Sequence, residues 1–130
     1  MAGFIPHTYG DGAVDGWAHL PAAAGTYHIG MALIQTSGNL TKASGAAKPT
    51  HICMTEKVVG TAGEVIAAIP VDASTTFEVA LTAAVSGLAA GVKASISTDG
   101  MSLVSGTDGA FYVEVTSGAA IGDTAFGRFA

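Results

Sequence analysis

Histidine is the side chain best suited to chemistry near neutral pH, because its imidazole titrates close to neutrality and binds metal ions. The chain contains four histidines. A metal site needs two or more of them to converge, and their spacing matches no metal-binding motif. We therefore expect no metal site, and we assign surface or hydrogen-bonding roles to His7, His19, His28 and His51.

Carboxylates could act as general acids and bases or bind calcium. Most of the aspartates adjoin a glycine or lie in a cluster of turn-forming residues, where Asp accepts hydrogen bonds from its own backbone. Asp11 and Asp15 lack the oxygen ligands and the terminal Glu of an EF-hand calcium loop. Glu78 and Glu114 fall on the expected outer faces of strands. We assign these groups to turns and to solvated surface.

Cys53 is the only cysteine, which excludes an intramolecular disulfide and every multi-cysteine metal motif. Its neighbours Ile52 and Met54 are apolar, so a buried thiol is expected. The sequence contains no nucleophile elbow, phosphate-binding loop or dinucleotide-binding glycine motif. We therefore expect neither an enzyme nor a cofactor.

Short runs of β-favouring residues, separated by turn signals, follow one another from residue 26 onward. The cluster at 36–39 predicts a hairpin between residues 27–35 and 40–43. Asp99-Gly100 and Asp108-Gly109 each predict a tight turn in which glycine takes a positive φ. Residues 85–91 are expected to form a connecting loop, and the last predicted pair of strands is 111–116 with 124–129.

Alternation of apolar and polar residues predicts which strand faces are buried. Phe77, Val79 and Leu81 share one face, and so do Phe111, Val113 and Val115; we expect both faces to be core. Pro70 is expected to end a strand's ladder or to lie on an edge strand. These features predict an all-β, single-domain body over residues 26–130, an antiparallel β-sandwich or β-barrel of about seven to nine short strands.

Residues 1–25 are predicted to form an extended N-terminal arm, because this segment is rich in glycine and proline and lacks periodicity. The segment is nevertheless too apolar for a solvated linker. We expect the body of the same chain or a neighbouring subunit to cover its apolar side chains. Because aromatic anchors dominate protein interfaces, the predicted partner-binding residues are Phe4, Tyr9 and Trp17.

Charged residues make up only 12% of the chain, against about 25% in ordinary soluble domains. Sparse charge suggests a surface covered by partners or by other copies, and hence a homo-oligomer. The alternative is a monomer whose surface is made polar by Thr, Ser and Gly. Although the mean hydropathy is +0.49, no window approaches the ~18 apolar residues that span a bilayer, so no membrane partner is expected.

The net charge of −5 and the scattered positions of the five basic residues give no clustered basic surface, so nucleic-acid binding is not expected. The first residues lack the basic and apolar regions of a signal peptide. We therefore expect the protein to be made in the cytoplasm and not secreted.

A series of short motifs follows a fixed order through the body: residues 30–33 and 38–42, residues 48–52, residues 76–79, residues 91–93 with the Asp99-Gly100 turn, and residues 122–123 with 127–129. In this order of turns, the stretch from Ile29 to Phe129 resembles small virion proteins of tailed bacteriophages, of the capsid-decoration (cement) and head-fibre type. The resemblance implies a β-barrel or β-sandwich that binds the outer capsid surface, often as an oligomer, and it carries over no catalytic residue.

The function expected from these observations is that of a structural virion protein, made in the host cytoplasm and located on the outer capsid surface. Its partner would be the major capsid protein, and it would stabilise the capsid by bridging coat subunits. The alternative is a host-surface or glycan-binding module, or a fibre-base protein. A small all-β enzyme is a third interpretation, for which the sequence offers no constellation of residues.

Overall fold

The computed structural model describes residues 3–7, 18–106 and 108–129, and these residues confirm the all-β prediction. They form thirteen strands in a six-stranded sheet, a five-stranded sheet and a two-stranded ribbon, with every strand pair antiparallel. The predicted number of seven to nine strands is wrong. Several strands have only three or four residues, which is too short for a clear alternating pattern.

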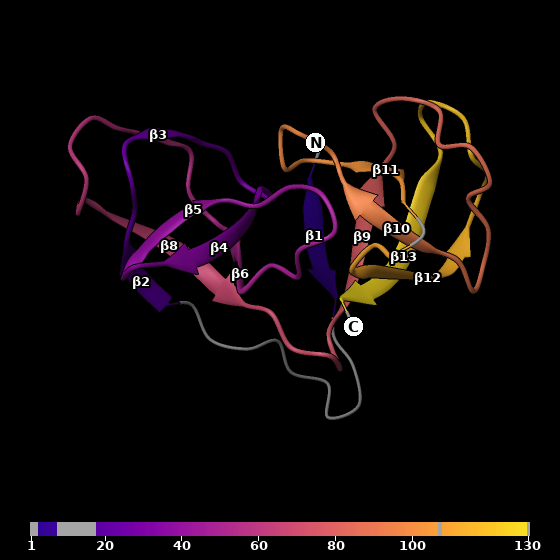
Figure 1. Cartoon of the computed structure of the whole chain (residues 1–130), viewed down its shortest axis with the longest axis horizontal. Coiled ribbons are helices and arrows are strands. Elements are labelled where there is room, and N and C mark those ends of the chain that lie inside the picture. Colours follow the sequence, from indigo (N-terminus) through magenta and orange to yellow (C-terminus); the bar gives the residue numbers. More distant parts are fainter. Residues whose placement is uncertain (1–2, 8–17, 107, 130) are drawn as a thin grey trace.

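The two main sheets occupy different halves of the molecule (Figure 1). The six-stranded sheet has the order β1 (Phe4–His7), β9 (Thr76–Ala80), β13 (Thr124–Phe129), β12 (Phe111–Thr116), β10 (Lys93–Ile96) and β11 (Leu103–Ser105). The five-stranded sheet has the order β2 (Ala18–Pro21), β8 (Val65–Pro70), β6 (His51–Cys53), β4 (Ala32–Thr36) and β5 (Asn39–Lys42), and the ribbon pairs β3 (Gly25–Tyr27) with β7 (Lys57–Val59).

The five-stranded sheet buries both of its faces. Neighbouring residues of a strand point to opposite faces, and in β6 Ile52 packs in the core shared with the six-stranded sheet, whereas Cys53 packs in a second core. Tyr27 of β3 and Val59 of β7 belong to that second core. The ribbon therefore lies over one face of the five-stranded sheet, and the six-stranded sheet covers the other.

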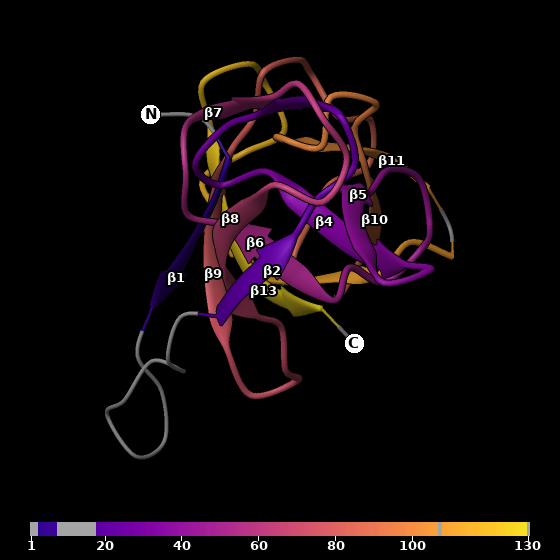
Figure 2. The same cartoon turned by 90° about the vertical axis from the view of Figure 1, so that its left-hand side faces the viewer.

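The five-stranded sheet also curls, so that its two edges approach each other, as Figure 2 shows from the side. Ala22, directly after β2, forms a parallel bridge with Leu40 of β5, and the Ala23 N–H donates to the Leu40 carbonyl at 2.9 Å. This single bridge joins the two edges without completing a ladder between β2 and β5 in the described residues.

Four phenylalanines form the centre of the shared core on the inner face of the six-stranded sheet. Phe129 lies 5.1 Å from Phe4, 5.3 Å from Phe77 and 5.1 Å from Phe111, measured between ring centroids. All four side chains are fully buried. The expected core positions Phe77, Phe111 and Val113 are confirmed, and Val79 and Leu81 are buried with them.

The segment predicted as an arm contributes strands to the body. β1 pairs with β9, and β2 pairs with β8. Phe4 on β1 is fully buried in the chain's own core. Because these two strands take part in backbone ladders of the main sheets, the described residues of the segment belong to the body of the fold.

Three hairpin turns follow the sequence signals. β4 and β5 are joined by a two-residue turn in which Ser37 and Gly38 have φ values of 52° and 86°. β10 and β11 are joined through Gly100, with φ 74°. β12 and β13 also pair directly, and the hairpin predictions at these three places are confirmed.

The chain does turn at Asp108-Gly109, where the Gly109 N–H donates to the Gly106 carbonyl at 3.3 Å, but the predicted hairpin and the positive φ at Gly109 are wrong. β11 and β12 are not neighbours, because both pair with β10, which lies between them. The connection crosses β10 so closely that a Cβ at Gly109 would lie 2.0 Å from the Ala94 carbonyl oxygen. Glycine is needed at 109 for this close approach of two backbones rather than for a positive φ.

Candidate interaction surface

Of the three predicted partner-binding residues, the structure describes only Phe4. Phe4 lies in the core, in ring contact with Phe111 and Phe129, so no partner can reach it without opening the fold. We therefore assign Phe4 to the core. Tyr9 and Trp17 lie outside the described residues.

The histidines for which contacts are described make ordinary hydrogen bonds. His28 Nδ1 lies 2.9 Å from Glu56 Oε2, with both side chains exposed. His51 Nδ1 lies 2.9 Å from Thr50 Oγ1, and burial lowers the pKa of His51. Among the residues that the structure describes, no three His, Cys, Asp or Glu side chains are grouped so that they could hold a metal ion.

Three aspartates accept hydrogen bonds from backbone N–H groups in turns, as the sequence predicts. Asp72 Oδ1 accepts the N–H of Ser74 at 2.9 Å. Asp99 Oδ1 accepts the N–H of Met101 at 3.0 Å, and Asp123 Oδ2 accepts that of Ala120 at 3.0 Å. The hydrogen bond that Asp99 accepts from the hydroxyl of its neighbour Ser97 is the main cause of its lowered pKa. These carboxylates are committed to local structure.

Cys53 is a core residue, which confirms the expected buried thiol. Its Sγ–H donates to the Thr55 carbonyl at 3.1 Å. Burial raises the pKa of the Cys53 thiol. A raised pKa and burial both suppress the thiolate form, which is the reactive nucleophile.

Exposed apolar side chains gather on the outer side of β12. A register shift, or β-bulge, between Val113 and Val115 breaks the alternation of this strand. As a result, Val115 is 54% exposed, and the prediction that it lies in the core with Phe111 and Val113 is wrong. Tyr112 is 37% exposed. We call the outward-facing residues of this region the β12 face: Tyr112, Glu114, Val115 and Arg128.

The β12 face contains one ion pair and has a lysine beside it. Arg128 of β13 lies opposite Tyr112, and its guanidinium pairs with the Glu114 carboxylate. On the other side of β12, Lys93 of β10 lies opposite Tyr112. The face therefore combines an aromatic ring and an exposed valine with one internal ion pair and one neighbouring lysine.

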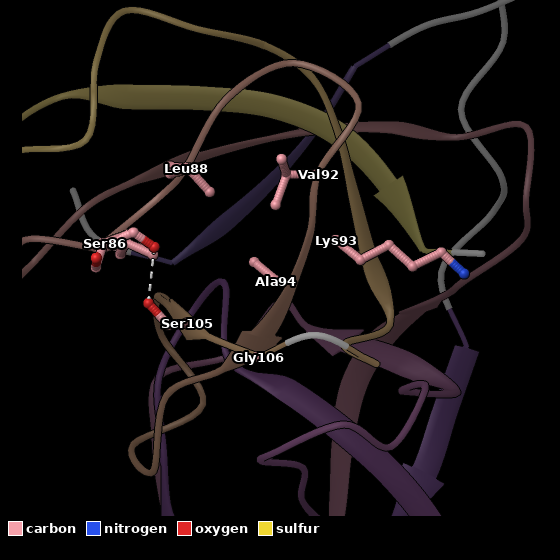
Figure 3. A pocket seen from close by; sticks show the side chains of 8 residues that line it. Ser86, Leu88, Val92, Lys93, Ala94, Ser105 and Gly106 are labelled. Atoms are coloured by element: carbon pink, nitrogen blue, oxygen red, sulfur yellow. Dashed lines mark hydrogen bonds between the residues drawn. The ribbon is translucent and has the colours of Figure 1, made fainter.

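A small pocket lies under the loop that precedes β10 (Figure 3). Its volume is about 150 Å³. The Ser105 hydroxyl donates to the Ser86 carbonyl at 3.0 Å across one side of the pocket. Among the described residues that line the pocket, Lys93 is the only ionisable one, and Val92 is 38% exposed. The pocket is lined by Val85, Ser86, Leu88, Val92, Lys93, Ala94, Ser105 and Gly106.

The pocket was not predictable from the sequence, because its walls come from three separate segments. Residues 85–91 form the predicted connecting loop, but Val85 and Leu88 are buried and anchor the loop to the core. These two apolar residues in a glycine-containing loop are the sequence signal that could have indicated a structured wall. The β12 face lacked such a signal, since period-2 alternation places Val115 inside.

No protein-family model matches this sequence, and comparisons with curated proteins and with solved structures found no match. Within residues 3–7, 18–106 and 108–129 there is no helix of the length and apolar character needed to cross a membrane.

Proposed function

We propose that this protein is a structural component of a tailed-bacteriophage virion, which binds the outer capsid surface and stabilises it by bridging coat subunits. We further infer that the two main sheets act as the layers of an antiparallel β-sandwich. The observation that carries the proposal is the β12 face, an exposed strand surface that combines Tyr112 and Val115 with one internal ion pair, on an all-β scaffold with few charges. The order of turns, which resembles that of capsid-decoration proteins, supports the same class of protein.

The β12 face suits a permanent protein contact. Burial of apolar surface contributes about 25 cal/mol per Å², and tyrosine is among the residues that contribute most at interfaces. Because Arg128 already pairs with Glu114, docking leaves neither of these two charges unpaired, and burying the pair costs less desolvation than burying an unpaired ion would. Contacts repeated on a capsid lattice, or made by a homo-oligomer, would add avidity.

Binding to capsids tests this proposal. Capsids of the tailed phage that encodes the chain are purified without the protein, and the full chain is then added. We expect saturable co-sedimentation and a higher temperature of capsid disruption, because a ligand of the assembled state stabilises that state. A protein that leaves the disruption temperature unchanged and stays in the supernatant would exclude the proposal.

Val115→Asp is the informative variant, because it places a charge on the β12 face without touching the core. We expect it to weaken capsid binding at least about tenfold, the effect of a disrupted interface anchor. Val58→Asp is the matched control: Val58 is exposed on β7, in the two-stranded ribbon, and carries the same change of charge. Equal binding by the two variants would contradict a role for the β12 face.

The alternative function, a host-surface or glycan-binding module, is favoured by one observation. Tyr112 is an exposed aromatic side chain close to the Asp108-Gly109 segment, and aromatic rings in such positions can stack on ligands. Binding of the isolated protein to a glycan array, together with no binding to capsids, would select this alternative.

A further inference from the structure

We propose that Lys93 and Tyr112 form a binding site for one carboxylate of the coat protein, at the side of the β12 face that adjoins β10. The coat protein as the partner rests on the proposed function. The carboxylate follows from the charges and the strand register of this chain.

Lys93 belongs to the outer face of the six-stranded sheet. It lies opposite Tyr112 of β12, whereas its neighbour Ala94 is buried in the shared core on the inner face. Successive residues of a strand point to opposite faces, and Lys93 is exposed. Figure 3 shows its ammonium extending away from the apolar pocket. This cation is therefore available to a partner that covers the β12 face.

The charge of Lys93 is not balanced by a nearby anion of the described residues. Arg128 and Glu114 pair with each other, and Arg128 lies on β13, on the side of β12 away from β10. Lys93 forms no ion pair with any described residue. Glu78 of the outer face lies on β9, which is three strands from β10, or about 14 Å at the usual strand spacing, and salt screens exposed charges over that distance.

The local charge balance predicts the sign of the partner's charge. The whole chain has a net charge of −5, yet the β12 face and the lysine beside it carry two cations, Lys93 and Arg128, and one anion, Glu114. A partner that covers Lys93 removes its ammonium from water. This desolvation is unfavourable unless the partner supplies an opposite charge, so we expect an anionic group at this place.

Tyr112 supplies a second hydrogen-bond donor beside the cation. Directly opposed residues of antiparallel strands have Cβ atoms about 5 Å apart, so both side chains can reach one group placed over the pair. An ammonium and a phenol both donate, whereas an ionised carboxylate only accepts. One carboxylate oxygen can accept from Lys93 and the other from the Tyr112 hydroxyl. A neutral amide would leave the charge unbalanced, so the pair favours Asp or Glu of the partner over Asn or Gln.

Two substitutions that keep most of the apolar area test this site in the full chain. Lys93→Met removes the charge, and Tyr112→Phe removes only the hydroxyl. We expect Lys93→Met to bind capsids at least about tenfold more weakly than the wild type, and Tyr112→Phe about threefold to tenfold more weakly. Because both donors act on the same carboxylate, the double variant should lose less affinity than the product of the two single losses.

Controls cover both sides of the contact. Lys48→Met removes an exposed lysine between β5 and β6 and should bind like the wild type, and thermal unfolding checks that every variant keeps the wild-type fold. Capsids whose surface carboxylates have been converted to neutral amides, with a carbodiimide and ethanolamine, test the partner's chemistry. The wild type should bind them about as weakly as Lys93→Met does, whereas Lys93→Met should bind treated and untreated capsids nearly equally.

The outcomes separate this proposal from the proposed function. If the wild type binds capsids and Lys93→Met binds them equally well, the carboxylate site is overturned and the proposed function stands. Equal binding of the wild type to treated and untreated capsids would also overturn the site. If the wild type binds no capsids, the proposed function fails, and the coat protein as partner fails with it. A wild-type dimer that Lys93→Met converts to a monomer would show that a second copy supplies the carboxylate, and would overturn the proposal.

Discussion

Gly127 allows the two longest strands of the six-stranded sheet to lie close together. A Cβ at this position would lie 2.0 Å from the carbonyl oxygen of Tyr112 and 2.8 Å from the ring of Phe111. β13 is held on both sides, by β12 and by β9, so the strand cannot move away from the added atom. The requirement for glycine here is steric, since Gly127 is not among the glycines with a positive φ.

We therefore predict that Gly127→Ala lowers the free energy of unfolding by about 2 to 3 kcal/mol, as overpacking does in a core that cannot relax. Gly63→Ala is the control, because Gly63 has a positive φ of 103° and nothing within 4 Å of its Cβ position. That variant should lose only about 1 kcal/mol, the cost of the left-handed backbone. Urea denaturation of both variants gives the comparison, and equal losses would exclude the steric explanation.

His51 links stability to pH. It lies on β6 between β4 and β8, and burial lowers its pKa below 6.5. The unfolded chain therefore binds a proton at this residue more readily than the folded chain, and stability falls as the pH drops below the unfolded value. The pKa values of Glu56, Glu64 and Asp99 are also lowered, by hydrogen bonds from His28, Thr61 and Ser97 first of all, so their contributions are lost only as the pH falls below about 4.5.

We predict that the urea midpoint of the wild type decreases between about pH 7 and about pH 5, and that His51→Gln makes this part of the curve flatter. Below this range, the wild type and the variant should lose stability in parallel as the carboxylates protonate. His19→Gln, which removes an imidazole from β2, serves as the control. If the urea midpoint of His51→Gln falls with pH as steeply as that of the wild type, another group causes the pH dependence.

At the scale of elements, the turn between β4 and β5 carries the clearest local strain. Ser37 has a φ of 52°, the only positive value recorded for a non-glycine residue in the described segments. Together with Gly38 at 86°, it forms the two-residue turn with two positive φ values that favours Asn-Gly. We expect Ser37→Asn to raise the free energy of unfolding by about 0.5 kcal/mol, and Ser37→Val to lower it by about 1 kcal/mol, because β-branched residues resist this backbone. Thermal unfolding of both variants measures the change, and a stabilised Val variant would contradict this account.

Elements that depend on neighbours in the sequence were predictable, and those that depend on distant pairing were not. The β4–β5 and β10–β11 hairpins follow from Gly38 and Gly100 at their turns. In contrast, β8 and β9 follow each other in the chain but belong to different sheets, and nothing in residues 71–75 indicates this switch. The position of β10 between β11 and β12 likewise depends on backbone contacts between distant residues, such as Gly109 against Ala94.

The β12 face and the pocket could not be predicted from the sequence for a related reason. A single register shift after Val113 moves Val115 from the core to the outer face. No local residue pattern predicts this shift. The pocket needs the 85–92 loop, β10 and the end of β11 to come together. In both places the tertiary structure overrides the local pattern.

For the whole molecule, Phe4 connects the two halves of the fold. Its ring packs on Phe111 and Phe129 in the six-stranded sheet, while its N–H donates to the carbonyl of Gly30 at 2.8 Å. Gly30 lies between β3 and β4, in the other half. The shared core therefore favours one cooperative transition rather than separate unfolding of the halves.

We predict that Phe4→Ala lowers the free energy of unfolding by about 3 to 5 kcal/mol, the range for truncation of a buried phenylalanine. Ile5→Ala, on the half-buried opposite side of β1, should cost less than half as much. Calorimetry should show one transition in the wild type and in both variants. If Phe4→Ala stays as stable as Ile5→Ala, Phe4 does not have the central packing role described above.

The first and last strands also determine how the molecule responds to tension. β1 and β13 flank β9 on its two sides, and both run antiparallel to it, so they run parallel to each other; their arrows point the same way in Figure 1. The beginning of β1 and the end of β13 consequently lie at opposite ends of the sheet. A force that pulls these two ends apart acts along the strands and shears all the backbone hydrogen bonds of both ladders together, because those bonds lie perpendicular to the strands. A chain anchored by its two ends would therefore resist stretching far better than one whose strands can be peeled apart bond by bond.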